Sequence, residues 1–191
     1  MRTTQRQTNH HRVLRAACAL FCQDAYDISM DAVATQAGVS KQTVYSHFDS
    51  KQILFRAVVE ELLKPLRAAL SEPDAPLETV LRSFVQVYRA GSDGHGTSAI
   101  ARVLQMDPPK TLPAVRDVVD AACFDSLSRL SARIRVAMER GQLRDDDPDE
   151  AAQLFFALVR SLRGGPDLVD PVVRVFLNAY RNPRPASPLF T

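Results

Sequence analysis

Apolar residues recur at helical spacing along almost the whole chain, and this pattern limits the fold more than any other feature of the sequence. The first clear instance is the face formed by Val13, Leu14, Ala17, Leu20 and Phe21. Residues three and four positions apart lie on the same side of an α-helix, so such a face can be buried against other helices. No segment alternates apolar and polar residues over the length of a β-strand. The sequence therefore predicts an all-α fold.

Caps and helix breakers divide this pattern into separate helices. Serine and aspartate favour helix starts, whereas glycine and proline favour helix ends. The clearest start is Asp147–Glu150, where an N-cap aspartate is followed by a proline at the first helical position and a glutamate at the third. On these signals we expect helices over residues 10–24, 29–37, 40–48, 77–90, 97–106, 113–140, 147–163 and 168–181, with a further helix from Asp49 or Ser50 to about Leu70.

The bulk composition limits the class of protein. Hydrophobic residues make up 46% of the chain, which is enough to build a core. The sequence lacks an apolar run of about 18 residues, which argues against a membrane span or a membrane partner. The polar segment 1–12 does not resemble a secretion signal, and three cysteines without CxxC spacing argue against a disulfide framework and a zinc ribbon. We expect a cytoplasmic protein.

Charge is distributed unevenly, but the asymmetry is weak. Residues 1–56 hold seven Lys and Arg against four Asp and Glu, whereas residues 57–191 hold 17 against 18. The basic excess thus lies in the first third of the chain. An excess this small does not identify a nucleic-acid-binding protein, so a prediction of that function has to rest on a motif.

One such motif spans Ser29 to Phe48, with the sequence SMDAVATQAGVSKQTVYSHF. A short helix, a tight turn at Gly38 and a second short helix form the unit known as helix-turn-helix. The first helix needs small or apolar residues where the helices cross, and the second helix needs an apolar inner side. These positions are occupied by Val33, Ala34, Ala37, Val39, Val44 and Phe48.

The outer side of the second helix is polar and free of acidic residues. It carries Lys41, Gln42, Thr43, Tyr45, Ser46 and His47. An α-helix fits the major groove of DNA, and side chains of these types supply the hydrogen-bond donors and acceptors that read base edges. The alternative interpretation is a helical hairpin with a purely structural role.

The segment from His11 to Leu63 resembles the N-terminal domain of the TetR family of bacterial transcriptional regulators. The residues that carry the resemblance are Leu20-Phe21, Tyr26, Ala34, Gly38-Val39-Ser40-Lys41, Thr43-Val44-Tyr45-Ser46-His47-Phe48 and Ser50-Lys51. The rest of the chain is similar to the family only in length and helical layout. The resemblance implies a helix-turn-helix DNA-binding domain over residues 9–55 and a helical ligand-binding and dimerisation domain over 56–182. Residues 183–191, with three prolines, are expected to be a disordered tail.

The resemblance also implies which residues contact DNA. Thr43 and Tyr45 would hold phosphates, and Lys51 would add charge at the start of the fourth helix. The other polar residues of the second motif helix would face base edges or the DNA backbone, and the start of the first motif helix would face the opposite strand. The complete expected set is Ser29, Met30, Ser40, Lys41, Gln42, Thr43, Tyr45, Ser46, His47 and Lys51.

Two features depart from the family pattern. The link from Phe21 to Ser29 is one residue shorter than usual, and Ala25 replaces a glycine that would permit a left-handed backbone. Asp31 lies early in the first motif helix, where some members carry a basic residue that reads bases. We expect Asp31 to stabilise the positive end of that helix.

In this family the helices beyond the DNA-binding domain enclose an inducer pocket, which implies a small-molecule effector. Most apolar candidates for that pocket would be core residues in any case, and the arginines are candidate polar contacts. The expected set is Phe84, Tyr88, Arg89, Arg102, Val103, Met106, Phe124 and Leu127. The family builds its dimer from the last two long helices. The expected interface here is Phe155, Phe156, Val159, Leu162, Val172, Val175, Phe176 and Ala179.

These observations predict a ligand-responsive repressor that acts as a homodimer on a near-palindromic operator. An activator, or a DNA-binding protein without a ligand, is the alternative. An all-helical enzyme is the least favoured class, because no catalytic arrangement of side chains is evident. We expect no cofactor and no metal site, since helix capping explains the acidic residues around Asp147. Cys18 and Cys22 share a helix face, and we interpret them as small core residues.

Overall fold

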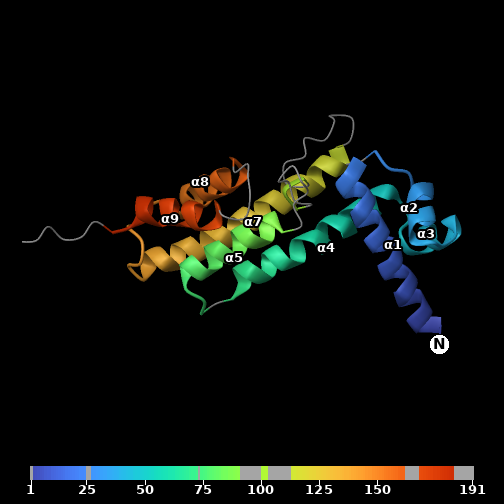
Figure 1. Ribbon diagram of the computed structural model, residues 1–191, viewed down its shortest axis with the longest axis horizontal. Helices are drawn as coiled ribbons and strands as arrows, with labels where there is room; N and C mark the ends of the chain where they lie inside the picture. The colour runs from blue at the N-terminus through green and yellow to red at the C-terminus, as the bar shows by residue number, and fades with distance from the viewer. Residues whose placement is uncertain are drawn as a thin grey trace, which may run out of the picture. The chain divides into compact units, whose positions relative to one another are not determined.

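The computed structural model describes residues 2–24, 27–72, 74–90, 100–102, 113–161 and 168–182, with residues 2–4 and 22–24 described by their backbone alone. The helices are α1 (Arg2–Asp24), α2 (Met30–Ala37), α3 (Lys41–His47), α4 (Lys51–Ser71), α5 (Leu77–Arg89), α7 (Pro113–Glu139), α8 (Pro148–Ser161) and α9 (Val169–Tyr180) (Figure 1). These residues contain no β-strand, and the predicted all-α fold is confirmed. None of the described helices is both long and apolar enough to cross a membrane.

The observed helix boundaries agree with the expected ones to within two residues, except at the start of α1. That helix begins at Arg2, eight residues before the expected start. Residues 2–9 contain neither glycine nor proline, so nothing in this polar segment stops the helix. The Gln5 side chain donates a hydrogen bond to Asn9 Oδ1 at 3.2 Å, one turn along. Of the helix expected over 97–106, only residues 100–102 are described, and they are helical.

The helices divide into two compact units, each with its own core. The first unit contains α1, α2, α3, the part of α4 up to Pro65 and the part of α7 up to Phe124. The second unit contains the remainder of α4 and α7 together with α5, α8 and α9.

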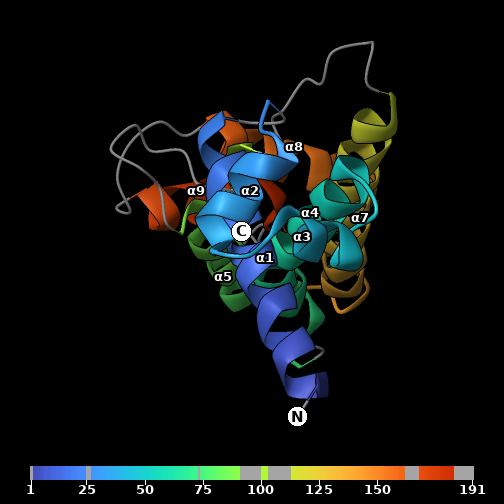
Figure 2. The ribbon, with the colours of Figure 1, turned by 90° about the vertical axis from the view of Figure 1, so that its right-hand side faces the viewer.

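The core of the first unit holds the two short helices of the motif in place. In this unit α1 contacts both α2 and α3, and α2 contacts α3 (Figure 2). The rings of Phe21 on α1 and Phe55 on α4 meet edge to face, with centroids 5.1 Å apart. Full burial of a large apolar side chain stabilises the fold by about 1.5–3 kcal/mol. The large side chains buried to this extent include Val13, Val33, Val44, Leu54, Phe55 and Val58.

The core of the second unit is a continuous cluster of aromatic rings from three helices. It contains Phe84 and Tyr88 of α5, Phe155 and Phe156 of α8, and Phe176 and Tyr180 of α9. Neighbouring ring centroids lie 4.8–6.1 Å apart, within the range of favourable aromatic contacts. Helix α9 contacts both α5 and α8 (Figure 1).

The turn between α7 and α8 is tied to the end of α9. Gly141 forms the turn with φ +69°, and its carbonyl accepts a hydrogen bond from Asn182 Nδ2 at 2.7 Å. The Arg144 N–H donates to the Tyr180 carbonyl at 2.8 Å, and the Arg144 guanidinium lies over the Tyr180 ring, 5.2 Å from its centroid. These contacts fix the C-terminal end of α9 to the second unit.

Helix capping and local pairing account for the acidic run before α8. Asp147 Oδ1 accepts from the N–H groups of Asp149 and Glu150 at 2.8 and 3.3 Å, which is the expected N-cap. The N–H of Asp147, and then the Arg144 guanidinium, hold the pKa of Asp146 below its ordinary value. Among the residues described, no three His, Cys, Asp or Glu side chains are arranged to hold a metal ion.

Candidate nucleic-acid interface

The two helices of the motif, α2 and α3, each begin at a serine cap. Ser29 Oγ accepts a hydrogen bond from the Ala32 N–H at 3.0 Å, and Ser40 Oγ accepts one from the Thr43 N–H at 3.1 Å. Both serines have the extended backbone that suits an N-cap. Each cap stabilises its helix by about 1 kcal/mol, so the sequence specifies where both helices start.

Gly38 forms the turn between α2 and α3 in a left-handed conformation, with φ +61° and ψ 41°. Its N–H donates to the Thr35 carbonyl and the Val39 N–H donates to the Ala34 carbonyl, both at 3.1 Å, which closes α2. The Gly38 carbonyl accepts a hydrogen bond from Arg12 Nη2 of α1 at 3.0 Å. Helix α1 therefore holds the turn directly.

The two sides of α3 differ as predicted. Val44 and Phe48 are buried on its inner side, and the Phe48 N–H ends the helix by donating to the Val44 carbonyl at 2.9 Å. On the outer side Tyr45 is the largest exposed side chain, at 42% exposure. We call this polar side the outer face of α3, and it comprises Lys41, Gln42, Thr43, Tyr45, Ser46 and His47.

Asp31 of α2 partly neutralises the charge of the outer face. Lys41 Nζ lies 2.9 Å from the Asp31 carboxylate, and both side chains are exposed. The hydrogen bond to Asp31, and then its negative charge, raise the pKa of Lys41, so this lysine stays protonated. An exposed ion pair contributes only about 0–1 kcal/mol, so Lys41 can exchange this carboxylate for another anion at little cost.

The remaining residues expected to contact DNA lie at helix starts. Ser29 and Ser40 are exposed, but their hydroxyl groups serve as caps. Met30 is only 7% exposed, so a contact from this position would come from its backbone and not from its side chain. Lys51 is half-buried at the start of α4; burial lowers its pKa, and the charge of Asp27 opposes that effect.

Sequence reasoning missed the contacts that His10 and Arg12 of α1 make with the motif. The His10 ring stacks on Phe48 with centroids 4.9 Å apart and meets His47 edge to face at 5.6 Å. Helical spacing could have indicated the inward position of His10, because this residue lies four positions before the buried Leu14 on the same face of α1. Arg12, which holds the turn, was also missed because its partner is a backbone carbonyl.

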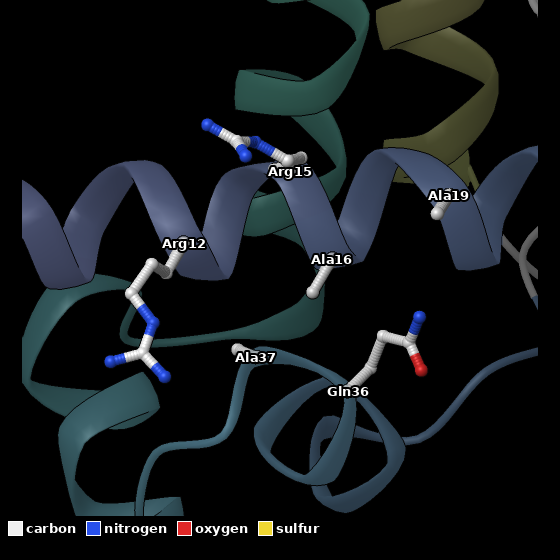
Figure 3. A pocket seen from close by; sticks show the side chains of 6 residues that line it. All are labelled: Arg12, Arg15, Ala16, Ala19, Gln36 and Ala37. Carbon is white, nitrogen blue, oxygen red and sulfur yellow. The ribbon is translucent and has the colours of Figure 1, made fainter.

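A surface hollow of about 380 Å³ lies between α1 and α2. Figure 3 shows Arg12 and Gln36 reaching into the space between these helices, whereas Arg15 points to the other side of α1. The small side chains of Ala16 and Ala37 allow the backbones to come close at this point. The hollow is lined by Arg12, Arg15, Ala16, Ala19, Gln36 and Ala37.

The residues expected to line a ligand pocket are divided between the two units. The second unit contains Phe84, Tyr88, Arg89 and Leu127, and the first unit contains Arg102 and Phe124. Val103 and Met106 lie outside the described residues. Phe84 and Tyr88 are buried in the aromatic cluster, whereas Phe124 is 74% exposed.

The residues expected at the dimer interface divide into a buried and an exposed group. Their own chain buries Phe155, Phe156, Val159, Val172 and Phe176. Val175 and Ala179 are exposed, and Leu162 lies outside the described residues. The buried group is occupied by core packing, so a second chain would meet the outer sides of α8 and α9. Leu154 is 54% exposed there, and sequence reasoning missed it beside the more apolar Phe155 and Phe156.

Comparisons with known proteins match both parts of the chain. Residues 13–58 match the family model of bacterial regulatory proteins of the tetR family. Residues 79–163 match the model of the C-terminal domain of AefR-like transcriptional repressors. An uncharacterized HTH-type transcriptional regulator of Bacillus subtilis strain 168, YhgD, is 28% identical over 156 residues, which cover 77% of this chain and 80% of the relative.

Solved structures show the same fold. The flavonoid-responsive regulator FrrA is 27% identical, with a TM-score of 0.62 and coverage of 91% of this chain and 97% of that chain. A protein of Mesorhizobium loti assigned to the TetR family is 24% identical, with a TM-score of 0.69 and coverage of 93% and 98%.

The all-helical fold and the polar outer face of α3 define a helix-turn-helix transcriptional regulator, not an enzyme. Both parts of the chain match models of one family, so the family can be named. The chain belongs to the TetR family of bacterial transcriptional regulators, as its sequence predicted.

Gly38 and Gly141 are the two left-handed glycines among the described residues, and they allow a test of how α1 holds the turn. Gly38→Ala and Gly141→Ala should each lose about 1–2 kcal/mol of stability, because an L-residue is strained at positive φ. Gly38→Ala should lose more, because its new Cβ would lie 2.8 Å from Arg12 Nη2 and would displace this group from the Gly38 carbonyl, whereas nothing lies within 4 Å of the Cβ at position 141. Chemical denaturation at one protein concentration measures both losses. Equal losses would show that the Arg12 contact adds nothing to the turn.

Proposed function

We propose that the chain is a ligand-responsive repressor that acts as a homodimer on a near-palindromic operator. The observation that carries this proposal is the outer face of α3, where six polar side chains and no acid project from a helix anchored by its buried inner side. Such a helix fits the major groove, where its side chains read base edges. Contact with chromosomal DNA would place the protein in the cytoplasm.

The side chains of the outer face divide by chemistry. The Gln42 amide offers the donor and acceptor pair that suits adenine. The Ser46 hydroxyl donates to the Thr43 carbonyl at 2.8 Å and keeps its lone pairs for a base donor. Tyr45 and Lys41 suit phosphates, which fix the register of the protein on the duplex without reading sequence.

Helix starts would supply further phosphate contacts. The N–H groups in the first turns of α2 and α4 can donate to phosphate oxygens, and Lys51 adds a positive charge at the start of α4. Ser50 Oγ accepts from the Ile53 N–H at 3.2 Å, which holds that helix start in a defined position. His47 at the end of α3 would face the backbone of the same groove.

We propose that the dimer forms through the outer sides of α8 and α9. Leu154, Val175 and Ala179 are exposed there, and an isologous contact between two copies would bury them. TetR-family regulators act as dimers and bind operator DNA and small-molecule ligands. In a dimer the two motifs would reach successive major grooves about 34–36 Å apart.

An effector would act by changing the spacing of the two motifs. A ligand shifts DNA affinity only by its preference between two states of the dimer. The likeness to a flavonoid-responsive regulator supports a small-molecule response, and the match to repressor C-terminal domains supports repression. A protein bound at a promoter blocks polymerase, which is the simplest route to that outcome.

DNA binding is tested by selecting duplexes from a random library with the full chain and measuring affinity by fluorescence anisotropy. Tyr45→Ala should weaken binding to all sequences, because a phosphate contact carries no sequence information. Lys51→Ala should lower the slope of log affinity against log salt concentration by about one per chain. Lys64→Ala is the matched control on α4, because Lys64 pairs with Glu61, and it should change neither quantity. The docking of α3 in the major groove would be refuted if the selection enriched no duplex. It would also be refuted if Tyr45→Ala and Lys51→Ala both bound DNA like the wild-type chain.

For the Asp31–Lys41 pair we predict a substitution that strengthens DNA binding. Asp31→Asn should strengthen DNA binding about twofold to tenfold at low salt, because it removes a negative charge beside the phosphates and releases Lys41. The gain should shrink as salt increases. Asp49→Asn provides a comparison with an exposed acid just beyond α3. Weaker binding by Asp31→Asn would mean that the pair positions Lys41 for its contact.

The dimer surface is tested by placing a charge on it. Val175→Glu should convert the dimer to a monomer, because an unpaired carboxylate would be buried in the interface. Gln86→Glu adds the same charge to an exposed position of α5 and should leave the dimer intact. Sedimentation analysis at micromolar concentration reads out the mass. A monomeric wild-type chain, or a dimeric Val175→Glu variant, would contradict this interface.

A further inference from the structure

Two basic side chains of α1 that precede the residues matched by the family model lie close to the end of α3. His10 lies edge to face with His47, with ring centroids 5.6 Å apart, and stacks on Phe48 at 4.9 Å. Arg6 lies one turn before His10, and its charge acts on His47. We call Arg6, His10 and His47 the α1 basic cluster. Arg6 and His10 precede residue 13, where the match to the DNA-binding family model begins.

Arg6 and His10 of the cluster lie in a basic segment that contains no acidic residues. Residues 1–23 contain four arginines and no Asp or Glu. His11 of α1 also lies close, with its ring centroid 6.0 Å from that of His10. On the neighbouring elements, Asp31 pairs with Lys41, Asp27 acts on Lys51, and Asp49 is an exposed acid beyond α3.

The free chain disfavours the charged form of His47. Burial, His10 and Arg6, in that order, lower the pKa of His47. Like charges this close repel each other unless an anion lies between them. Arg6 is exposed, while His10 and His47 are half-buried, so the group is open to an anion from outside.

We propose that Arg6 and His10 of α1, together with His47 of α3, bind a phosphate of the DNA backbone and take up a proton as they do so. This inference rests on the proposed docking of α3 in the major groove, since His47 closes that helix. It adds a contact from the first turns of α1, outside the helix-turn-helix motif. It also makes operator affinity depend on pH.

The direction of the pH dependence follows from linkage. A bound phosphate favours the charged imidazole and so raises the histidine pKa in the complex above its value in the free chain. The complex therefore holds more protons than the free chain between these two pKa values, and affinity increases as the pH falls through that window. A full proton taken up per chain corresponds to about tenfold in affinity per pH unit.

The test measures anisotropy of the full chain on two probes, a duplex selected with the wild-type chain and a duplex of random sequence, from about pH 8 to about pH 6. Wild-type affinity for both probes should increase about threefold to tenfold per chain over this range. His10→Phe keeps a ring on Phe48 but cannot be protonated, and His47→Asn removes the second imidazole. Each should remove at least half of the pH dependence.

Arg6→Gln tests the phosphate contact separately, with Arg15→Gln as the matched control. Nine residues, about two and a half turns, separate these arginines, so they project from opposite sides of α1. Arg6→Gln should weaken binding to both probes alike and lower the salt slope by about one per chain, whereas Arg15→Gln should do neither. Circular dichroism and thermal unfolding at each pH check that every variant is folded.

The outcomes separate this inference from the proposed function. Absence of binding to any duplex at every pH would overturn both. Binding with a wild-type affinity independent of pH, or with the same pH dependence in His10→Phe, would overturn proton uptake by the cluster. Equal effects of Arg6→Gln and Arg15→Gln would overturn the phosphate contact while leaving the docking of α3 in place.

Discussion

The position of α3 depends on the burial of Val44 and Phe48, and the DNA-binding face depends on the position of α3. A helix of seven residues is too short to be stable alone in water, so tertiary contacts have to maintain it. The Ser40 cap starts it, and the left-handed turn at Gly38 sets the direction in which it leaves α2. Arg12 and His10 add contacts from α1 to the turn and to Phe48. The outer face is therefore placed by residues that lie outside it.

In the second unit, too, buried side chains fix the positions of the helices. Six aromatic rings are used to pack α5, α8 and α9 together, so those side chains are not available to a partner. Smaller apolar residues remain exposed on α8 and α9, such as Leu154 and Val175, and these are the residues proposed to meet a second chain. An apolar residue of these helices is therefore available to a partner only if its own chain does not bury it.

Sequence alone predicted features that depend on local rules. The helix starts at Ser29, Ser40 and Asp147 and the turn at Gly38 were all predicted, because each depends on residues within a few positions. Contacts across the fold were not predicted. The pairing of Asp31 with Lys41 joins residues ten positions apart, and the stack of His10 on Phe48 joins residues of different helices. Helical spacing shows that a residue faces inward, but it does not say which neighbour it meets.

The same limit explains the aromatic residues of α8 and α9. Phe155 and Phe176 have the apolar character of an interface residue, and only the packed structure shows that their own chain buries them. The start of α1 was missed for another reason, since its first turns are polar and carry no apolar period. These turns contain Arg6 and His10, the residues through which α1 is proposed to reach DNA.

The central claim is that the outer face of α3 lies against the bases of the operator. Photo-crosslinking tests it most directly, with a benzophenone side chain placed at Gln42 of α3 or, as a control, at Gln36 near the end of α2. Both positions are exposed, so the probe should be accommodated at either one. The account predicts crosslinks to bases within the selected site from position 42 and none from position 36. Crosslinks from position 36 alone, or from neither position in a bound complex, would contradict it.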